Sequence, residues 1–200
     1  MDELLTDRHT PTGTAPTSTI RHVYIDTEFL RHNLTSRGLV SLALTDDDGT
    51  DYYAVNRGMD TTAVHADPWM RENVWPYLPL NPRGVLDLHG TEVRPYPTIR
   101  DEVSAYFADT TAATTYLYAN HGAQDIVRLH GLWDHDWAVM PTMIPRWFYD
   151  TKGLAAAAGN PELPAMEHGA HHPLEDARHN RTVRLFLAAR SAAGSTPEGG

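Results

Sequence analysis

The segment His22-Val23-Tyr24-Ile25-Asp26-Thr27-Glu28-Phe29 is a β-branched and aromatic run that ends in two acidic residues. Such a run is typical of a buried β-strand. Because side chains alternate between the faces of a strand, Asp26 and Glu28 should point to the same face. Two unit charges about 4 Å apart repel by roughly 4 kcal/mol at an effective dielectric near 20. The pair therefore predicts either a cation held between the two carboxylates or a strand end that lies in water.

The next segments predict a hairpin beside this strand. Residues 38–45 alternate apolar side chains, residues 46–49 read Asp-Asp-Asp-Gly, and residues 51–55 continue with Asp-Tyr-Tyr-Ala-Val. Asp and Gly are typical of tight turns between paired strands. We therefore expect a three-stranded antiparallel meander at the start of the ordered part.

Beyond residue 60 the pattern alternates between helices and strands. A polar run with Thr98 and Asp101 would cap one of the helices. Strands that form a meander and then alternate with helices predict an α/β domain, with a mixed β-sheet flanked by helices. The expected helices are 69–78, 99–107, one from residue 122, 154–158 and 173–189, and the expected strands are 115–119 and 147–149.

Composition indicates one globular domain over residues 20–190 of the 200. Residues 1–19 are rich in Thr and Pro and residues 191–200 are polar, so both are predicted to be disordered tails. The absence of cysteine excludes disulfides, thiolate zinc sites, iron–sulfur ligation and a cysteine nucleophile. No apolar run is long enough to span a membrane, and no signal-peptide pattern opens the chain, so a cytoplasmic location is expected.

The formal net charge of -10 argues against a protein that coats long nucleic acid. That kind of binding depends on many Lys and Arg side chains that neutralise phosphates. The charge does not exclude a nuclease, because divalent cations held by acidic side chains can supply the positive charge at a phosphate.

Three residues far along the chain are candidates for the same site as Asp26 and Glu28. Asp125 follows the 115–119 strand and falls in the first turn of the next helix, where it could face the same sheet edge or simply cap the helix. Pro is favoured at the first helical position, so Pro173 places His171 in the preceding loop and Asp176 in the first turn. His171 could equally be a surface histidine.

Taken in order, these segments resemble the motifs of the DEDDh exonucleases of the ribonuclease H-like fold. The nearer resemblance is to the actinobacterial polyadenylate-specific 3′-exoribonuclease AS group, through residues 24–29, 49–55 and 174–178. It covers most of residues 22–187. The chain departs from the wider family at Gln124, where an aromatic residue often precedes the middle aspartate.

The resemblance implies a 3′-5′ exoribonuclease that releases nucleoside 5′-monophosphates from single-stranded RNA. Asp26, Glu28, Asp125 and Asp176 would hold two Mg²⁺ or Mn²⁺ ions, and Asp26 would bridge them. Glu28 and Asp176 would complete one metal site, and Asp125 would hold the second ion. His171 would be the general base that takes a proton from the attacking water.

The expected substrate contacts come from residues that follow the first and fourth strands, namely Thr27, Phe29, Leu30 and Asn120. Aromatic side chains stack on bases in single-stranded binding sites, so Trp133 or Trp147 could add a platform, or both could be core residues. Four basic side chains could touch phosphates or lie in a solvated surface: Arg128, Arg146, Lys152 and Arg178.

Two other functions stay open on the residues alone. A DNA 3′-5′ exonuclease would use the same acids, because contacts to the 2′-hydroxyl select the sugar. A catalytically silent nucleic-acid-binding module could keep the fold without the chemistry. The resemblance also implies a homodimer, for which Trp75, Tyr77 and Leu78 are candidate contact residues.

Overall fold

A six-stranded mixed sheet is the centre of the computed structural model, which describes residues 19–166 and 171–194. The strand order across the sheet is β4-β3-β2-β1-β5-β6. β1 pairs with β2 and β2 with β3 in antiparallel fashion, and the other three pairs are parallel. The predicted meander and parallel strands are thereby confirmed. The strands are β1 (Ile20–Phe29), β2 (Leu39–Asp46), β3 (Asp51–Asn56), β4 (Val93–Arg94), β5 (Thr114–Ala119) and β6 (Tyr149–Asp150).

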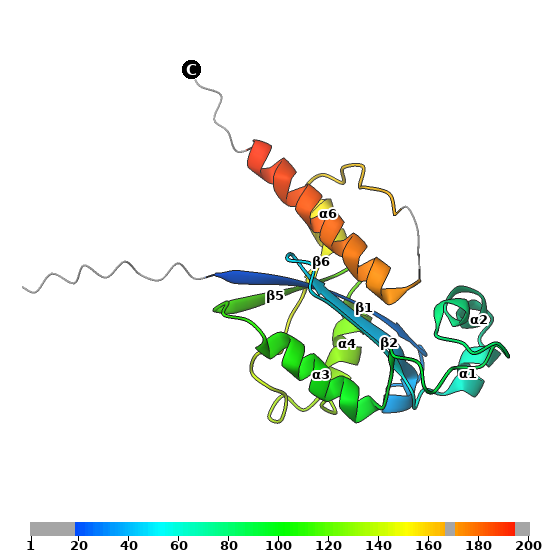
Figure 1. Ribbon diagram of the computed structural model, residues 1–200. Helices are drawn as coiled ribbons and strands as arrows, with labels where there is room; N and C mark the ends of the chain where they lie inside the picture. The colour runs from blue at the N-terminus through cyan, green and yellow to red at the C-terminus, as the bar shows by residue number, and fades with distance from the viewer. Residues whose placement is uncertain (1–18, 167–170, 195–200) are drawn as a thin grey trace, which may run out of the picture.

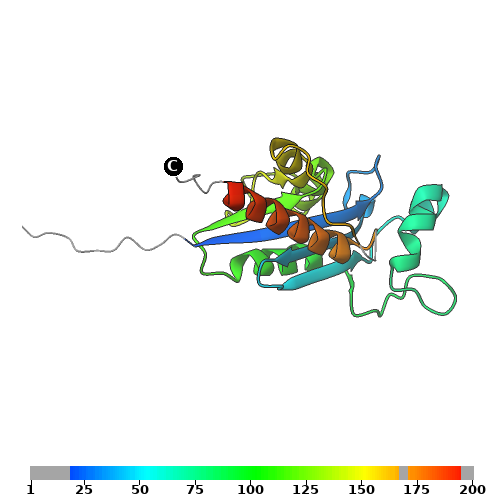
Figure 2. The same cartoon turned by 90° about the horizontal axis from the view of Figure 1, so that it is seen from above.

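Helices cover both faces of the sheet (Figures 1 and 2). α3 (Tyr96–Ala108) and α4 (Ala123–Gly131) pack on one face, over a core that contains Val23 and Ile25 of β1. α5 (Thr151–Ala157) and α6 (Pro173–Gly194) lie on the other face and meet through Ala155, Val183 and Leu187.

The alternation of β1 decides which side chains meet α6. Val23 and Ile25 point into the core, whereas Tyr24 points to the opposite face and stacks on Tyr118 of β5 at 5.3 Å. Asp26 and Glu28 continue this second face, because they follow Tyr24 at intervals of two residues. Opposite them on β2 lie Ala43 and Ser41. The acidic pair therefore sits on the sheet face that α6 crosses, at the carboxyl end of the central strand.

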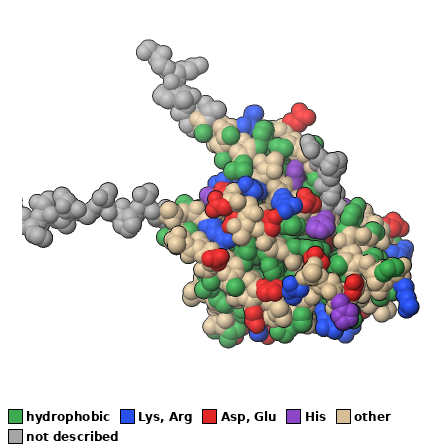
Figure 3. Space-filling model, in the orientation of Figure 1, with side chains coloured by type: hydrophobic (Ala, Val, Ile, Leu, Met, Phe, Trp, Pro, Cys, Tyr) green, Lys and Arg blue, Asp and Glu red, His purple; other side chains and the backbone are tan. Residues whose placement is uncertain are grey.

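Residues 57–92 form a projection that we call the arm. It contains α1 (Thr61–Ala66), α2 (Pro68–Asn73) and the 3₁₀ helix η2 (Trp75–Tyr77), and a second 3₁₀ helix, η1 (Ser36–Gly38), precedes β2. The arm lies beyond the end of the sheet at which α6 begins (Figures 1 and 2), and it forms the right-hand edge of the face in Figure 3. Its own apolar cluster joins it to β1, β2 and β3 through Leu30, Val40, Val55, Val64, Met70, Val74, Trp75 and Leu78.

The arm corrects two expectations. The predicted helix 69–78 is broken after Asn73, because Pro76 has no N–H to continue the helical hydrogen bonds, and α1 was not predicted. Trp75 and Leu78 are only 7% and 6% exposed, so they are core residues and not a contact surface. Tyr77, at 48% exposed, is the one of the three that reaches solvent.

Several element boundaries also differ from the sequence pattern. α3 begins at Tyr96, with Pro95 at the N-cap and no side-chain cap, so the predicted cap by Thr98 is wrong. Pro residues at the start of a helix replace a cap because they need no hydrogen-bond partner there. β4 was not predicted, because a two-residue strand carries no periodicity, and β6 overlaps the predicted strand 147–149 only at Tyr149.

The chain ends of the domain are described only in part. α6 continues to Gly194, past the predicted boundary at residue 190. The rest of the two predicted tails, residues 1–18 and 195–200, lies outside the described residues. Among the described helices none has both the length and the apolar character to cross a membrane.

Gly122 is a test of how α4 is seated on the sheet. A Cβ at this position would lie 2.4 Å from Cβ of Ala119 and 2.8 Å from Cε2 of Phe148. We expect Gly122→Ala to lower the free energy of unfolding by about 1–3 kcal/mol, because Ala119 of β5 and Phe148 must both move away from the new methyl group. The control is Gly153→Ala in α5, where the nearest atom is Asp150 Cβ at 3.8 Å. Equal denaturation midpoints for Gly122→Ala and the wild type would contradict this packing.

Candidate active site

Thr27 joins the end of β1 to the start of α4. Its backbone N–H and its hydroxyl both donate to Oδ1 of Asp125, at 2.9 and 2.6 Å. α4 begins at Ala123, so Asp125 lies in the first turn, as the sequence predicts. These two hydrogen bonds hold the Asp125 carboxylate beside Asp26, although the two residues are far apart in the sequence.

The start of α6 brings the second part of the site. Pro173 is the first residue of α6, and the N–H of Asp176 donates to the carbonyl of His172 at 3.0 Å. His171 lies in the preceding loop with a φ of 68°, a left-handed conformation that is uncommon for a residue with a side chain. Its backbone N–H donates to Oδ2 of Asp176 at 2.8 Å. The predicted order of loop, cap and first turn is confirmed.

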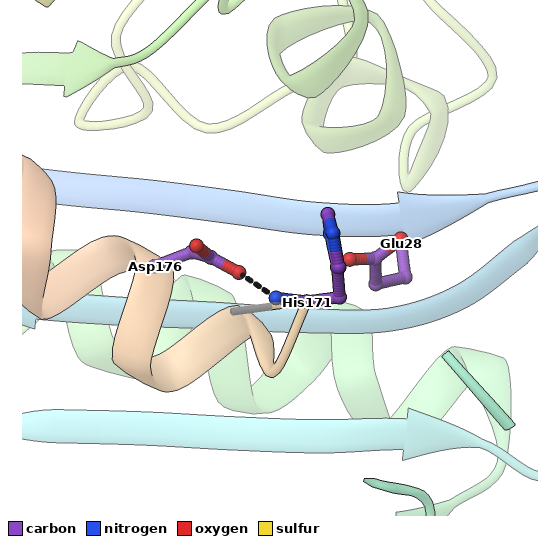
Figure 4. Close-up of side chains that lie close together, drawn as sticks. All are labelled: Glu28, His171 and Asp176. Atoms are coloured by element: carbon purple, nitrogen blue, oxygen red, sulfur yellow. Dashed lines mark hydrogen bonds between the residues drawn. The ribbon is translucent and has the colours of Figure 1, made fainter. Parts of the chain in front are cut away.

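Glu28, His171 and Asp176 converge on one point (Figure 4). One ligand atom from each of these three side chains lies within 4.8 Å of the others. Glu28 comes from β1, His171 from the loop and Asp176 from α6. Carboxylate oxygens and an imidazole nitrogen at this spacing form a candidate metal site.

Burial raises the pKa values of four carboxyl groups. We call these four residues the acidic cluster: Asp26, Glu28, Asp125 and Asp176. Burial, followed by the charges of Asp125, Asp176 and Glu28, raises the pKa of Asp26 well above its usual range. Burial and the charges of Asp176 and Asp125 raise the pKa of Glu28 to about 8. The carboxylates therefore lie close together in a poorly solvated part of the structure.

Hydrogen bonds stabilise the charged forms of the remaining two acids and oppose the rise in their pKa. Burial raises the pKa of Asp125 to about 6, against the effect of the two Thr27 donors. Burial also raises the pKa of Asp176, against the effect of the His171 N–H. Carboxylates that repel one another form a suitable binding site for a divalent cation. The cation would offset their repulsion and would bind their oxygens directly.

The structure places the predicted substrate residues in different surroundings. Phe29 is half-buried, and the Arg128 guanidinium stacks 4.5 Å from the centre of its ring. Leu30 is 8% exposed and belongs to the arm's apolar cluster. Asn120 is exposed, and its Oδ1 accepts from Thr151 Oγ1 at 3.4 Å. Thr27 is buried against Asp125.

The residues suggested as base-stacking platforms and as phosphate contacts also lie in different surroundings. Trp133 is part of the core beneath α4, whereas Trp147 is 61% exposed. Arg128 donates to the carbonyls of Leu30 and Asn33, and Arg178 forms ion pairs with Asp51 and Glu175. Lys152 is exposed.

Two aromatic residues next to the site were not singled out from the sequence. The ring of Trp69 in α2 lies edge-on to the His171 ring, with centroids 4.9 Å apart, and the Tyr53 ring lies 4.7 Å from that of His172. Trp69 opens a segment that reads as an ordinary amphipathic helix, and Tyr53 sits in an ordinary strand. No local pattern could have revealed either contact, because each joins segments more than 100 residues apart.

The comparison with characterised proteins identifies the family. Two curated 3′-5′ exoribonucleases of Mycobacterium tuberculosis, from strains CDC 1551 and H37Rv, are each 32% identical over 174 residues. The match covers 86% of this chain and 96% of each relative. The chain belongs to the DEDDh family of 3′-5′ exoribonucleases. No family model matches it.

Solved structures of other exonucleases share the fold. The zinc-bound complex of E. coli exonuclease I with single-stranded DNA superposes with a TM-score of 0.57 at 9% identity, over 88% of this chain and 41% of that one. The chain thus spans about two fifths of the E. coli protein. The nuclease domain of 3′hExo, a DEDDh family member bound to rAMP, gives a TM-score of 0.52 at 9% identity, over 88% of this chain and 92% of that one. The exonuclease assignment therefore agrees with the ribonuclease H-like sheet.

The acidic cluster should make the metal-free protein sensitive to pH. Glu28 is neutral in both folded and unfolded chains below its ordinary pKa of 4.5, and its ionisation disfavours the folded state from there up to about pH 8. The melting temperature in EDTA should therefore fall as pH rises through this window. Mg²⁺ or Mn²⁺ should restore it, most strongly at the upper end, because the cation competes with the proton.

Glu28→Gln tests whether the Glu28 charge, and not the titration of other groups, causes this loss of stability. The variant should melt higher than the wild type in EDTA near pH 8, by about 2 °C or more, since 1 kcal/mol shifts the melting temperature by about 2–4 °C in a domain of this size. Glu162→Gln, at an exposed position, should leave the melting curve unchanged. A Glu28→Gln protein that melts lower than the wild type throughout this range would contradict the repulsion.

Proposed function

We propose that this chain removes nucleoside 5′-monophosphates one at a time from the 3′ end of single-stranded RNA. The observation that carries the proposal is the convergence of Glu28, His171 and Asp176 within 4.8 Å beside the other members of the acidic cluster. The direction of cleavage and the RNA substrate are supported by the names of the 32% identical relatives.

In the proposed mechanism the acidic cluster holds two Mg²⁺ or Mn²⁺ ions. When bound, these cations would neutralise charge on the scissile phosphate and on the leaving oxygen. Thr27 keeps Asp125 oriented toward the site through its two hydrogen bonds, and the His171 N–H does the same for Asp176. The His171 imidazole, next to both Glu28 and Asp176, would accept the proton of the attacking water.

The four expected substrate residues are proposed to act in two ways. Phe29 and Asn120 would contact the terminal nucleotide directly, Phe29 through its ring and Asn120 through its exposed amide. Thr27 and Leu30 are buried, so they would act through neighbours. Thr27 orients Asp125, and the Leu30 carbonyl accepts from Arg128, which covers the Phe29 ring.

A nuclease assay with 3′-labelled single-stranded RNA and Mn²⁺ or Mg²⁺ tests the function. We expect release of labelled nucleoside monophosphate that EDTA abolishes. Asp26→Asn should lower kcat by more than about 100-fold, because the amide cannot serve as an anionic ligand. His171→Ala should lower it by about 10²–10⁴-fold, the usual contribution of a general base. Asp101→Asn, at a side chain that is 70% exposed, should leave the rate unchanged.

The same assay with single-stranded DNA decides the sugar. Faster turnover of DNA than of RNA would replace the proposed substrate with DNA, and no turnover of either under any metal condition would overturn the proposed activity. Wild-type rates in Asp26→Asn would move the chemistry to another part of the molecule.

We propose further that the enzyme acts in the cytoplasm as a homodimer. The family resemblance supports the dimer, and exposed apolar side chains offer a surface for it in the loop between α4 and β6. Trp137, Val139, Met143 and Trp147 are between 42% and 64% exposed. Large exposed apolar patches are typical of protein–protein contacts.

Light scattering coupled to size exclusion tests the dimer. We expect a mass of about twice the 22.3 kDa of one chain. Val139→Glu should shift the protein toward the monomer, because a charge would be buried in the contact. Val85→Glu is the matched control, since Val85 is 56% exposed but lies in the arm. A monomeric wild type at micromolar concentration would exclude the dimer.

A further inference from the structure

No hydrogen bond from residues 19–166 or 171–194 orients the His171 ring. Its backbone is fixed by the hydrogen bond to Asp176, but no hydrogen bond reaches either ring nitrogen from these described residues. General bases in enzymes are usually oriented by a third group, commonly a carboxylate or a carbonyl. The orientation of this imidazole therefore depends on the side chains that surround it.

Trp69 supplies that packing. Its ring lies edge-on to the His171 ring, at a centroid distance of 4.9 Å and an interplanar angle of 77°. Edge-to-face contact is a preferred geometry for aromatic pairs and fixes the relative orientation of the two planes. Glu28 and Asp176 approach the same imidazole within 4.8 Å. The indole and the two carboxylates thus surround the ring.

The arm holds Trp69 firmly enough for this role. Asp67 caps α2 by accepting hydrogen bonds from the N–H groups of Trp69, at 2.9 Å, and Met70, at 3.2 Å. The neighbouring Met70 is 3% exposed and anchors α2 in the arm's apolar cluster. The backbone of Trp69 is therefore fixed while its indole remains outside that cluster.

The exposure of Trp69 does not suit a residue kept for stability. Trp69 is 40% exposed, whereas the next residue, Met70, is buried in the arm's apolar cluster. Arg31, which is itself exposed, lies with its guanidinium 6.0 Å from the indole centre. Trp69 therefore bridges the loop after β1 and the loop before α6, the two segments that flank Glu28.

We propose that Trp69 is a positioning residue that orients the His171 imidazole for proton abstraction. The arm then belongs to the active site, although it supplies no acid. This inference rests on the proposed role of His171 as the general base. It predicts that the aromatic ring of residue 69 matters for kcat and not for substrate binding.

Steady-state kinetics of three variants tests the role. Trp69→Ala and Trp69→Leu should each lower kcat by about 10–100-fold, the loss expected for a misplaced catalytic group. KM should change by less than about threefold, because uniform substrate binding is kept. Trp69→Phe should recover most of the rate, since a phenyl ring can make the same edge contact. A KM that rises in Trp69→Leu with kcat unchanged would overturn the proposal in favour of direct substrate contact.

A double-mutant cycle tests whether Trp69 acts through His171. In a His171→Ala background, Trp69→Leu should cause no further loss of kcat, because the group that it positions is already gone. Losses that multiply would overturn the proposal. Tyr116→Ala is the matched control, because Tyr116 also lies edge-on to a histidine, His22, and both residues lie outside the site and the proposed dimer surface. This variant should keep wild-type kcat.

A measurement without substrate separates this inference from the nuclease activity. In the NMR spectrum of the metal-free protein, the ring proton signal of His171 should be shifted by the indole ring current and should move in Trp69→Leu but not in Tyr116→Ala. An unchanged His171 signal in Trp69→Leu would overturn the contact even in an active enzyme. A shifted signal in an enzyme without RNA turnover would locate the failure in the proposed function.

Discussion

Electrostatic repulsion within the acidic cluster is the constraint on which the rest of the structure depends. Burial disfavours the charged forms of all four carboxylates, and the charges of Asp125 and Asp176 raise the pKa of both Asp26 and Glu28 further. The protein keeps them together with directed donors. Thr27 donates twice to Asp125, and the His171 N–H donates to Asp176. Both of these acids also lie in first helical turns, where the helix dipole favours negative charge.

The sheet provides the geometry that this arrangement requires. One face of β1 carries Val23 and Ile25 into the core, and the other carries the acids toward α6. α6 is fixed along its length by contacts with the sheet, including Arg184, which donates to Asp47 and lies over Tyr118. A helix held at its far end presents its first turn to the end of β1 reproducibly. Stability and site geometry thus come from the same contacts.

The sequence could predict the parts of the site that are encoded locally. Asp26 and Glu28 follow from strand alternation, Asp125 from its place after β5, and the relation of His171 to Asp176 from Pro173. These signals span few residues, and each has a definite geometric meaning. The antiparallel meander and the mixed character of the sheet follow from the same local patterns together with the family resemblance.

The remaining features depend on contacts that no local pattern records. The sequence pattern places Trp69 at the start of a helix over residues 69–78. The break after Asn73 and the packing of the arm are what bring its ring to His171. Leu30 stands next to Phe29 in the sequence, but the arm's cluster buries it, and no pattern in β1 reveals the arm. Trp75 and Leu78 were read as surface residues for the same reason. The prolines that replace side-chain caps at α3 caused the misplaced helix start.

Binding of Mn²⁺ to the metal-free protein, measured by titration calorimetry near pH 7.5, tests the central claim most directly. If the acidic cluster is a shared cation site, the wild type should bind two ions per chain, and Asp26→Asn should weaken or abolish the binding of both, since Asp26 is the residue proposed to hold both ions. A wild type that binds no Mn²⁺, or an Asp26→Asn variant with wild-type affinity and stoichiometry, would contradict the account.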